Sequence, residues 1–547
     1  MTPRPAAQPD AGPGRPLRGD RIHRYVNAFC PTCHEEDPQR ALADVRRLSG
    51  WLAERDGRIW LERGCPVHGF IRTLYDESPE ILSYLETWTA PTKSHVADSP
   101  GNYLPVPSAY LHGLPEMQTQ HTCILLEDVT EHCNLRCPTC FADSAPALTG
   151  VASVEEVLAN VDARLAREDG RLDVVMLSGG EPTLHPQFAR LLDELVARPI
   201  VRILVNTNGL TIAKDDALLA LFARHHQRVE VYLQYDGHSE RSSRHHRGGD
   251  LRAFKDTAIE RLSGAGVFVT LTMTAALGVN DDEIGHVILR SLETPFVCGV
   301  SIQPQFGSGR SGAIDPTDRL THTGVLARMG PQTDGLVTWR DLTALPCSHP
   351  HCASVGYMLK DDSGTWRSLT EVIGHDRLLE WLDLVPEDVA NRITDQDLPA
   401  QMRTVVKESL LGLMSDSTSL SHPQVGDLWK GVCDSCDIGM STLATLAGSR
   451  LPGGQDRLRR LLADRVKRIS VKPFMDMSTM IEERLTQCCV HVGTRADGTG
   501  GSDPGADQCA PFCAVQAWGP LAAQKIGVGS RSAPAPVPVD LAIGATR

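Results

Sequence analysis

Residues 123–141 read CILLEDVTEHCNLRCPTCF, an apolar run that leads directly into Cys133, Cys137 and Cys140. The first half has the aliphatic composition of a buried strand, and the second half has the polar composition of a loop. Thiolates at this spacing converge easily on one metal centre. A closed structural site needs four ligands, so three cysteines predict a centre with one open position; a zinc knuckle that takes a distant fourth ligand is the alternative.

Five further apolar runs follow the first one, each separated from the next by enough residues for one helix. They cover residues 172–180, 201–209, 229–237, 267–275 and 297–305, and helix-like stretches at 154–168, 188–198 and 215–226 lie between them. Six such β-α units predict a parallel sheet over residues 121–335, flat or curled into a partial barrel. In these folds the chemistry lies on the loops after the carboxyl ends of the strands.

Polar motifs fall at those strand ends. Gly179-Gly180-Glu181-Pro182 follows the second strand, Asn206-Thr207-Asn208-Gly209 the third, Tyr235-Asp236-Gly237 the fourth, and Gln303 and Gln305 the sixth. Because the carboxyl ends of parallel strands share one edge of a sheet, we expect these loops to enclose one pocket together with the three cysteines.

The cysteine loop, the GGEP motif and the NTNG motif, in this order, resemble the radical S-adenosylmethionine (radical SAM) superfamily. The resemblance implies an α/β fold with a partial (β/α)6 barrel of the TIM type. It implies a 4Fe-4S cluster on Cys133, Cys137 and Cys140, whose open iron binds S-adenosylmethionine and cleaves it to a 5′-deoxyadenosyl radical. It also implies cofactor contacts from Gly179, Gly180, Glu181, Pro182, Asn206, Asn208, Asp236 and Gln303. Many members carry an aromatic residue before the third cysteine, where this chain has Thr139.

The chain has 547 residues, sixteen cysteines and a net charge of −14. This length predicts two or three domains, and the acidic balance argues against a nucleic-acid partner. No apolar run is long enough for a membrane span, and the Pro- and Arg-rich start lacks the apolar core of a secretory signal. We expect a cytoplasmic protein with disordered tails at 1–22 and 521–547.

Residues 23–95 predict a small metal-binding domain, joined to the core by a linker at 96–120. Cys30 and Cys33, with Cys65 and His68, form a Cys3His set at the spacing of two metal-binding knuckles, with a strand at 57–64 between them. Thiolate-rich tetrahedral ligation suits zinc or a mononuclear iron, and the imidazole favours zinc.

Residues 336–520 predict a separate cysteine-rich iron–sulfur domain with helices at 377–385 and 456–469. Its eight paired cysteines would serve two auxiliary 4Fe-4S clusters, with zinc or partly free thiols as the alternative. They are Cys347, Cys352, Cys433, Cys436, Cys488, Cys489, Cys509 and Cys513. Their pairing stays open, although the neighbours Cys488 and Cys489 are expected to separate. His349, His351 and His491 are possible substitute ligands, and the isolated Cys123 and Cys298 are predicted core residues.

The layout of residues 23–520 resembles one branch of the superfamily, the archaeal tetraether lipid synthases and the methyltransferase-like radical SAM proteins with their bacterial relatives. This resemblance rests on the CPxC and CPxHG knuckles and on the late segments FMDMSTMIEERLTQCCVHV and QCAPFCAVQAWGPL. It implies auxiliary clusters, a rubredoxin-like N-terminal site and carbon–carbon bond formation at an unactivated carbon of a lipid-like or other small substrate. A flavodoxin- or ferredoxin-type protein would supply electrons.

Three alternatives remain open at this point. The enzyme could methylate an unactivated carbon with a folate- or SAM-derived methyl group, it could modify peptides, or the chain could be a non-catalytic metal-binding scaffold. The loop at 238–254, with four arginines and three histidines, could bind an anionic substrate group, although a solvated helix start is the favoured interpretation.

Overall fold

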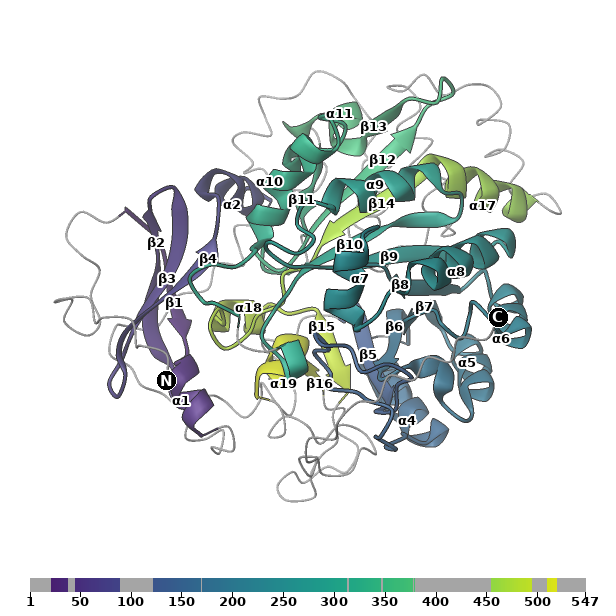
Figure 1. Cartoon of the computed structure of the whole chain (residues 1–547), viewed down its shortest axis with the longest axis horizontal. Helices are drawn as coiled ribbons and strands as arrows, with labels where there is room; N and C mark the ends of the chain where they lie inside the picture. The colour runs from purple at the N-terminus through teal and green to yellow at the C-terminus, as the bar shows by residue number, and fades with distance from the viewer. Residues whose placement is uncertain are drawn as a thin grey trace.

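The computed structural model describes residues 21–37, 45–88, 122–168, 170–311, 314–345, 348–376, 378, 454–493 and 509–518. Two sheets organise these residues, a four-stranded antiparallel sheet and a twelve-stranded mixed sheet. In Figure 1 the small sheet lies at one side of the molecule, and the large sheet with its helices forms the rest. None of the described helices is both long and apolar enough to cross a membrane.

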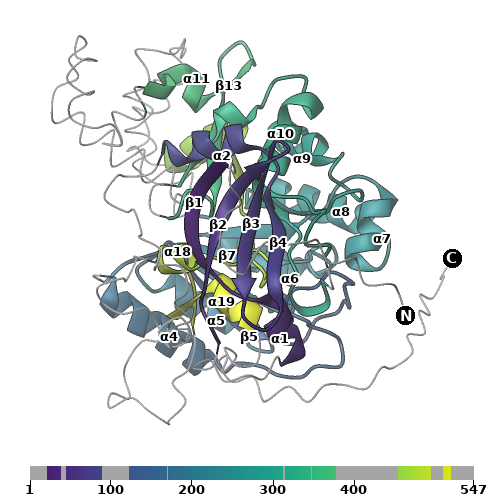
Figure 2. The same ribbon diagram turned by 90° about the vertical axis from the view of Figure 1, so that its left-hand side faces the viewer.

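The small sheet is a meander of β1 (Arg21–Ala28), β2 (Leu48–Arg55), β3 (Arg58–Cys65) and β4 (Gly69–Asp76). Figure 2 shows its four strands side by side, facing the viewer. The short helix α1 (Pro31–Glu36) follows β1, and α2 (Pro79–Glu86) follows β4. The strand predicted at 57–64 is confirmed as β3. Its hairpin with β4 and the β1–α1 turn carry the two predicted knuckles.

Six parallel strands form the centre of the large sheet, in the spatial order of the chain. They are β5 (Ile124–Thr130), β6 (Leu172–Gly179), β7 (Ile200–Thr207), β8 (Val229–Gln234), β9 (Phe268–Ala275) and β10 (Val297–Pro304). Each begins and ends within a few residues of a predicted apolar run. The predicted (β/α)6 half-barrel is therefore confirmed.

Helices cover the outer face of these strands, where their apolar sides pack in one large core. They are α4 (Val154–Arg167), α5 (Phe188–Val196), α6 (Asp216–Arg224), α8 (Arg252–Gly264), α9 (Ile284–Glu293) and α10 (His322–Gln332), whereas the polar helix α7 (Glu240–Arg247) contributes no residue to this core. A local signal fixes the start of α4, a capping box in which Ser153 and Glu156 bond each other's backbone N–H. The three helices predicted at 154–168, 188–198 and 215–226 are α4, α5 and α6.

The C-terminal region differs from the separate domain that the sequence suggested. It adds β14 (Val466–Val471) parallel to β10 at one end of the half-barrel and β15 (Val490–Gly493) parallel to β5 at the other. The remaining elements are β11 (Thr343–Ala344), β12 (Ser354–Lys360), β13 (Trp366–Ser368), α11 (Leu369–Ile373), α17 (Gly454–Arg465), α18 (Glu482–Thr486), β16 (Cys509–Pro511) and α19 (Phe512–Trp518).

The helix predicted over 456–469 was partly wrong, because VKRI is the start of β14 and α17 ends at Arg465. Backbone pairing to β10 on one side and β12 on the other overrides the helical pattern there. The other predicted helix, at 377–385, lies outside the described residues apart from Leu378.

Contacts from the C-terminal region also hold the small sheet against the core. Phe29 packs edge-on against Trp518 with ring centroids 5.3 Å apart. The fully buried Arg63 donates to the carbonyl oxygens of Phe29 and Ser478 at 2.7 and 3.0 Å. The same segment therefore completes the half-barrel and docks the N-terminal domain.

Candidate active site and metal centres

The loop with Cys133, Cys137 and Cys140 leaves the carboxyl end of β5 and is fixed by groups from distant parts of the chain. Arg310, which lies in the 3-10 turn Gly309–Ser311 after β10, donates to the carbonyl of Cys137 at 3.0 Å through Nε and to the carbonyl of Cys140 at 2.9 Å through its backbone N–H. Its guanidinium also pairs with Asp143 at 2.7 Å. The loop is thus bound to the opposite end of the half-barrel.

The three thiols line a cavity of about 820 Å³, mouth included, at the carboxyl edge of the sheet. Among the described residues that line it, no further cysteine and no histidine is present. Burial raises the pKa of the Cys133 thiol to about 12, although the Leu135 N–H, 3.4 Å from the sulfur, acts in the opposite direction. Burial also raises the pKa of the Cys137 thiol, so these two sulfurs need a metal to be held as thiolates at neutral pH.

Gly179 and Gly180 end β6 against the segment that precedes Cys133. The backbone N–H of Gly180 bonds the carbonyl of Thr130 at 2.5 Å, and that of Glu181 bonds the carbonyl of His132 at 2.8 Å. A Cβ atom at position 180 would collide with the His132 carbonyl, and Gly179 has a φ of +110°. Both positions need glycine because two backbones meet there.

Glu181 is buried, and its carboxylate organises the next loop. It accepts hydrogen bonds from Thr207 Oγ1 at 2.7 Å and from the Asn208 backbone N–H at 2.8 Å. Because these bonds occupy both oxygens, Glu181 positions the NTNG loop beside the cysteines. Pro182 starts the 3-10 turn Pro182–Leu184 and does not line the cavity.

Asn206, Asn208 and Gln303 all line the cavity. The side-chain amide of Asn208 donates to Asn134 Oδ1 at 2.7 Å and lies 3.9 Å from Cys133 Sγ. That of Asn206 accepts from Gln234 Nε2 at 2.8 Å. The polar motifs of four different strand ends thus surround the cysteine loop.

Asp236 lies just behind the cavity wall and pairs there with Arg247, the last residue of α7. Arg247 does line the cavity, as does Gln234, and sequence reasoning singled out neither. The buried Lys255 donates to the carbonyl of Asn208, and burial lowers its pKa to about 8. The sequence signal that could have identified Arg247 was a basic residue shortly after a strand end. Four arginines in this segment fit that description, so the signal does not single out Arg247.

The arginines at 238–254 are paired with carboxylates. Arg241 binds Asp282, Arg244 binds Glu240, and Arg252 binds Asp250, all at 2.5–2.7 Å on exposed parts of the surface. Ser239 caps the start of α7. The interpretation of this segment as a solvated helix start is supported for these three residues.

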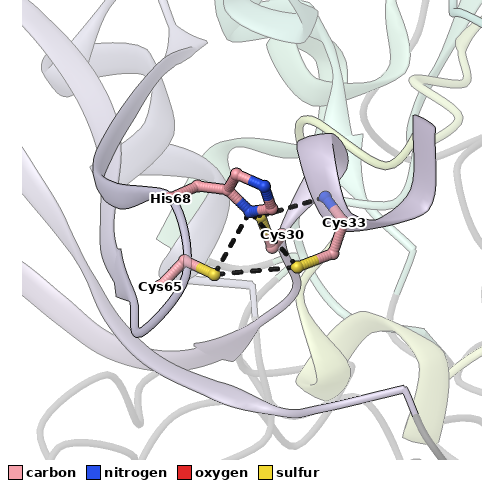
Figure 3. Close-up of side chains that lie close together, drawn as sticks. All are labelled: Cys30, Cys33, Cys65 and His68. Atoms are coloured by element: carbon pink, nitrogen blue, oxygen red, sulfur yellow. Dashed lines mark hydrogen bonds between the residues drawn. The ribbon is translucent and has the colours of Figure 1, made fainter. Parts of the chain in front are cut away.

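The N-terminal set forms a compact tetrahedral site, drawn in Figure 3. The ligand atoms of Cys30, Cys33, Cys65 and His68 all lie within 4.8 Å of one another. His68 Nδ1 is 3.4, 3.3 and 3.6 Å from the three sulfurs, and the sulfurs of Cys33 and Cys65 are 3.7 Å apart. Zn–S bonds of about 2.3 Å place two sulfurs of a tetrahedron about 3.8 Å apart, so zinc fits.

Three C-terminal cysteines gather on the side of α18 and α19. Cys352, Cys488 and Cys513 are close enough to interact electrostatically, and Arg484 Nε points at Cys352 Sγ from 3.4 Å. Burial raises the pKa of Cys513 to about 11. Cys489 is buried in an apolar cluster that also contains Cys513, and its separation from Cys488 stays a prediction. Arg484 and His351 line a hollow of about 400 Å³ that shares Pro304 and Gln305 with the larger cavity.

The remaining candidate ligands are placed as follows. Cys347, Cys433 and Cys436 lie outside the described residues, and of Cys509 only the backbone, in β16, is described. His351 bonds Tyr75 and Glu86, and His491 bonds Thr122 Oγ1 at 2.9 Å. His349 lies 3.1 Å from Arg24 Nη1. Cys123 and Cys298 are buried, as predicted.

Comparison with known proteins agrees with this geometry. Residues 128–290 match the radical SAM superfamily, and residues 22–77 match the family described as the HMPTM N-terminal zinc ribbon domain. The chain therefore contains a radical SAM domain behind an N-terminal zinc ribbon. Radical SAM domains use a 4Fe-4S cluster and S-adenosylmethionine, and the three-thiol loop with one open position fits both.

The chain is also similar to two curated relatives and to one solved structure. The 7,8-dihydro-6-hydroxymethylpterin dimethyltransferase of Methanocaldococcus jannaschii is 25% identical over 87% of this chain and 92% of its own. The subtilosin biosynthesis protein AlbA of Bacillus subtilis is 26% identical over 37% of this chain and 44% of its own. A solved radical SAM methyltransferase from Sphaerobacter thermophilus is 16% identical, with a TM-score of 0.30 over 56% of this chain and 79% of its own. The archaeal relative confirms the predicted resemblance to methyltransferase-like radical SAM proteins.

Proposed function

We propose that this radical SAM enzyme transfers a methyl group to an unactivated carbon of a small heterocycle of the dihydropterin class. The observation that carries the proposal is the three-cysteine loop opening onto a cavity lined by the amide side chains of Asn206, Asn208, Gln234, Gln303 and Gln305. Amides donate and accept hydrogen bonds, which suits a fused ring that carries amino, carbonyl and ring-nitrogen groups.

The archaeal relative supports this choice over lipid coupling. Its name specifies a dihydropterin and a dimethyl transfer, and its similarity extends over 87% of this chain. The sequence prediction was carbon–carbon coupling on a lipid-like substrate, with methylation as an alternative, and this relative favours the alternative. Coupling of lipid chains, which the other members of the branch suggested, stays a prediction that the same assay can test.

The residues that line the cavity have different proposed roles, according to where they lie. When bound, the cluster and S-adenosylmethionine supply hydrogen-atom abstraction, which a side-chain base cannot replace at an unactivated carbon. Cys133, Cys137 and Cys140 hold the cluster. The backbone at Gly179 and Gly180 and the amides of Asn206 and Asn208 face the position of the cofactor, while Gln303 and Gln305 approach from β10 and orient the substrate.

Cys352, Cys488 and Cys513 are the described residues that would hold an auxiliary cluster, with one of the other C-terminal cysteines as a fourth ligand. The hollow beside Arg484 shares Pro304 and Gln305 with the catalytic cavity, which supports electron exchange between this centre and the substrate. A flavodoxin- or ferredoxin-type protein is the proposed source of electrons for the catalytic cluster.

The test is a labelling experiment on anaerobically reconstituted protein. The reduced enzyme is given S-adenosylmethionine and 7,8-dihydro-6-hydroxymethylpterin, with the methyl label carried either by S-adenosylmethionine or by a reduced folate. We expect 5′-deoxyadenosine and a labelled, methylated pterin, and the arm with label in the product identifies the methyl donor. Formation of 5′-deoxyadenosine with an unchanged pterin would reject the substrate class, and lipid and peptide arms run in parallel would then show which alternative holds.

A further inference from the structure

Arg247 behaves differently from the other arginines of its segment. The side chains of Arg241, Arg244 and Arg252 are 54, 62 and 41% exposed, whereas that of Arg247 is 12% exposed. The last turn of α7 directs it inward, toward the strand ends and the cysteine loop. A buried arginine at the edge of a catalytic cavity requires a partner and indicates a specific task.

Asp236 and Gln234 hold the guanidinium in one orientation. Arg247 donates to the two oxygens of Asp236 at 2.6 and 2.7 Å and to Gln234 Oε1 at 2.8 Å. Asp236 also accepts the Thr274 backbone N–H at 3.1 Å, so β9 fixes the carboxylate in turn. A two-point arginine–carboxylate pair constrains both position and angle, which a lysine at the same place cannot reproduce.

The opposite side of the same helix end contacts the cysteine loop. Thr139 Oγ1 lies 3.0 Å from His246 Nδ1, and a Cβ at Gly248 would stand 3.6 Å from Pro138. Arg247 and Cys137 line the same cavity, and the guanidinium is close enough to the Cys137 sulfur to interact with it electrostatically. Arg247 therefore lies between the Asp236 carboxylate and a sulfur that the cluster would use.

We propose that Arg247 is a positioning residue that sets the reduction potential of the catalytic 4Fe-4S cluster through the sulfur of Cys137. Reduction adds a negative charge to the cluster, and a guanidinium held near one of its sulfurs stabilises that charge more than it stabilises the oxidised form. Asp236 opposes this effect from behind Arg247 and at the same time keeps the guanidinium aimed at the sulfur.

This arrangement predicts two shifts of opposite sign. Replacing Arg247 by glutamine removes the positive charge and should lower the reduction potential. Replacing Asp236 by asparagine removes the opposing charge while an amide oxygen can still accept from Thr274 and Arg247, and should raise the potential. If the pair served only to attach α7 to the cysteine loop, the two variants would not shift the reduction potential in opposite directions.

The experiment is an anaerobic redox titration of the reconstituted full chain, followed by electron paramagnetic resonance, in the absence of S-adenosylmethionine. Adding the cofactor at the end of each titration marks the catalytic cluster, because only a cluster with an open iron responds to it. The variants are Arg247→Gln, Arg247→Lys and Asp236→Asn. Arg244→Gln, one turn earlier on the exposed face, is the matched control.

We expect at least a tenfold lower ratio of reduced to oxidised cluster for Arg247→Gln at a fixed potential, which is a downward shift of about 59 mV for one electron. Arg247→Lys should shift less, Asp236→Asn should shift upward, and Arg244→Gln should match the wild type. The proposal is overturned if the potential of Arg247→Gln equals that of the wild type, or if the glutamine and asparagine variants shift in the same direction. If Arg247→Gln does not retain its cluster, the opposite signs of Arg247→Lys and Asp236→Asn decide the question.

Discussion

The cysteine site of the zinc ribbon and that of the half-barrel loop differ in how they are closed. At the zinc ribbon, four ligand atoms lie within 4.8 Å of one another and are supplied by two neighbouring turns. At the half-barrel, three thiols line an open cavity, and no fourth cysteine or histidine lines it among the described residues. A site with all its ligands can only hold a metal, whereas a site that lacks one can also bind a reactant.

The two sites also differ in what supports them. His68 receives its outer contact from Glu36, whose carboxylate lies 3.0 Å from Nε2, so the zinc site is built almost entirely from its own hairpin and turn. The open loop depends on Arg310 after β10, Gly180 after β6 and Asn208 after β7. An open site cannot rely on its metal for rigidity, and the surrounding fold has to provide it.

The largest expected effect is a loss of catalysis at the open site that leaves the zinc site unchanged. Cys137→Ala removes a ligand from the open loop and should abolish the release of 5′-deoxyadenosine from S-adenosylmethionine, while the zinc content stays unchanged. Cys298→Ala, at a buried cysteine away from the cavity, is the matched control and should retain the reaction. Residual cleavage by Cys137→Ala above the rate without protein would reject the assignment of the catalytic loop. The measurement is product quantification by mass spectrometry with metal analysis of the same samples.

Removing the closed site should give the next largest effect, on stability instead of chemistry. Cys65→Ala should lose the zinc and most of the stability of the ribbon, since structural zinc contributes about 10 kcal/mol or more to folding in small zinc domains. The half-barrel should retain its cluster and its ability to cleave S-adenosylmethionine. Calorimetry should show the loss of one transition or an earlier onset of unfolding. Complete loss of the catalytic cluster in this variant would show that the ribbon has more than a structural role.

A third change tests the support of the open loop. The Glu181 carboxylate accepts hydrogen bonds from the Thr207 hydroxyl and from the Asn208 backbone N–H. In Glu181→Gln one carboxylate oxygen becomes an NH2 group, which would face one of these two donors. The loss of charge-assisted bonds in a buried place costs about 1.5–3 kcal/mol, which predicts a tenfold to hundredfold slower cleavage of S-adenosylmethionine. Glu293→Gln, on the exposed end of α9, should behave as the wild type. An unchanged rate for Glu181→Gln would mean that the NTNG loop is fixed by other contacts.

The smallest effect concerns the outer contact of the zinc site. Glu36→Gln weakens the orientation of His68 and should lower zinc affinity by about tenfold, at the low end of what second-layer carboxylates contribute. Competition with a chromogenic chelator measures this affinity. Glu35→Gln, on the same short helix, provides the control. Equal affinity in both variants would show that the three thiolates alone determine the strength of binding.

Local patterns predicted much of the half-barrel. Its six strands are β-branched, apolar runs separated by helices, and each strand was predicted within a few residues. The strands β14 and β15 were missed for a physical reason: VKRI continues a charged helix, and VHVG is four residues long inside a cysteine-rich segment. Their partners β10 and β5 lie more than a hundred residues earlier, and tertiary pairing of that kind leaves no local signal.

The candidate site shows the same limit. The glycines at 179 and 180 could be identified because close approach of two backbones imposes a residue type, and the cysteines because ligand spacing does. Arg247 could not be distinguished from Arg244 on the same helix, since only the packing of α7 against the strand ends turns one inward and leaves the other in solvent.

The pairing of β15 with β5 has a consequence for biosynthesis. Val490 and its neighbours seal one border of the half-barrel, and β14, starting at Val466, seals the other. Until those residues leave the ribosome, both borders present unpaired backbone groups that can recruit foreign strands. Before these strands pair, the sheet that supports the cysteine loop is incomplete. We therefore expect iron to be inserted after translation, and we expect chaperones to protect the unpaired strand edges until then.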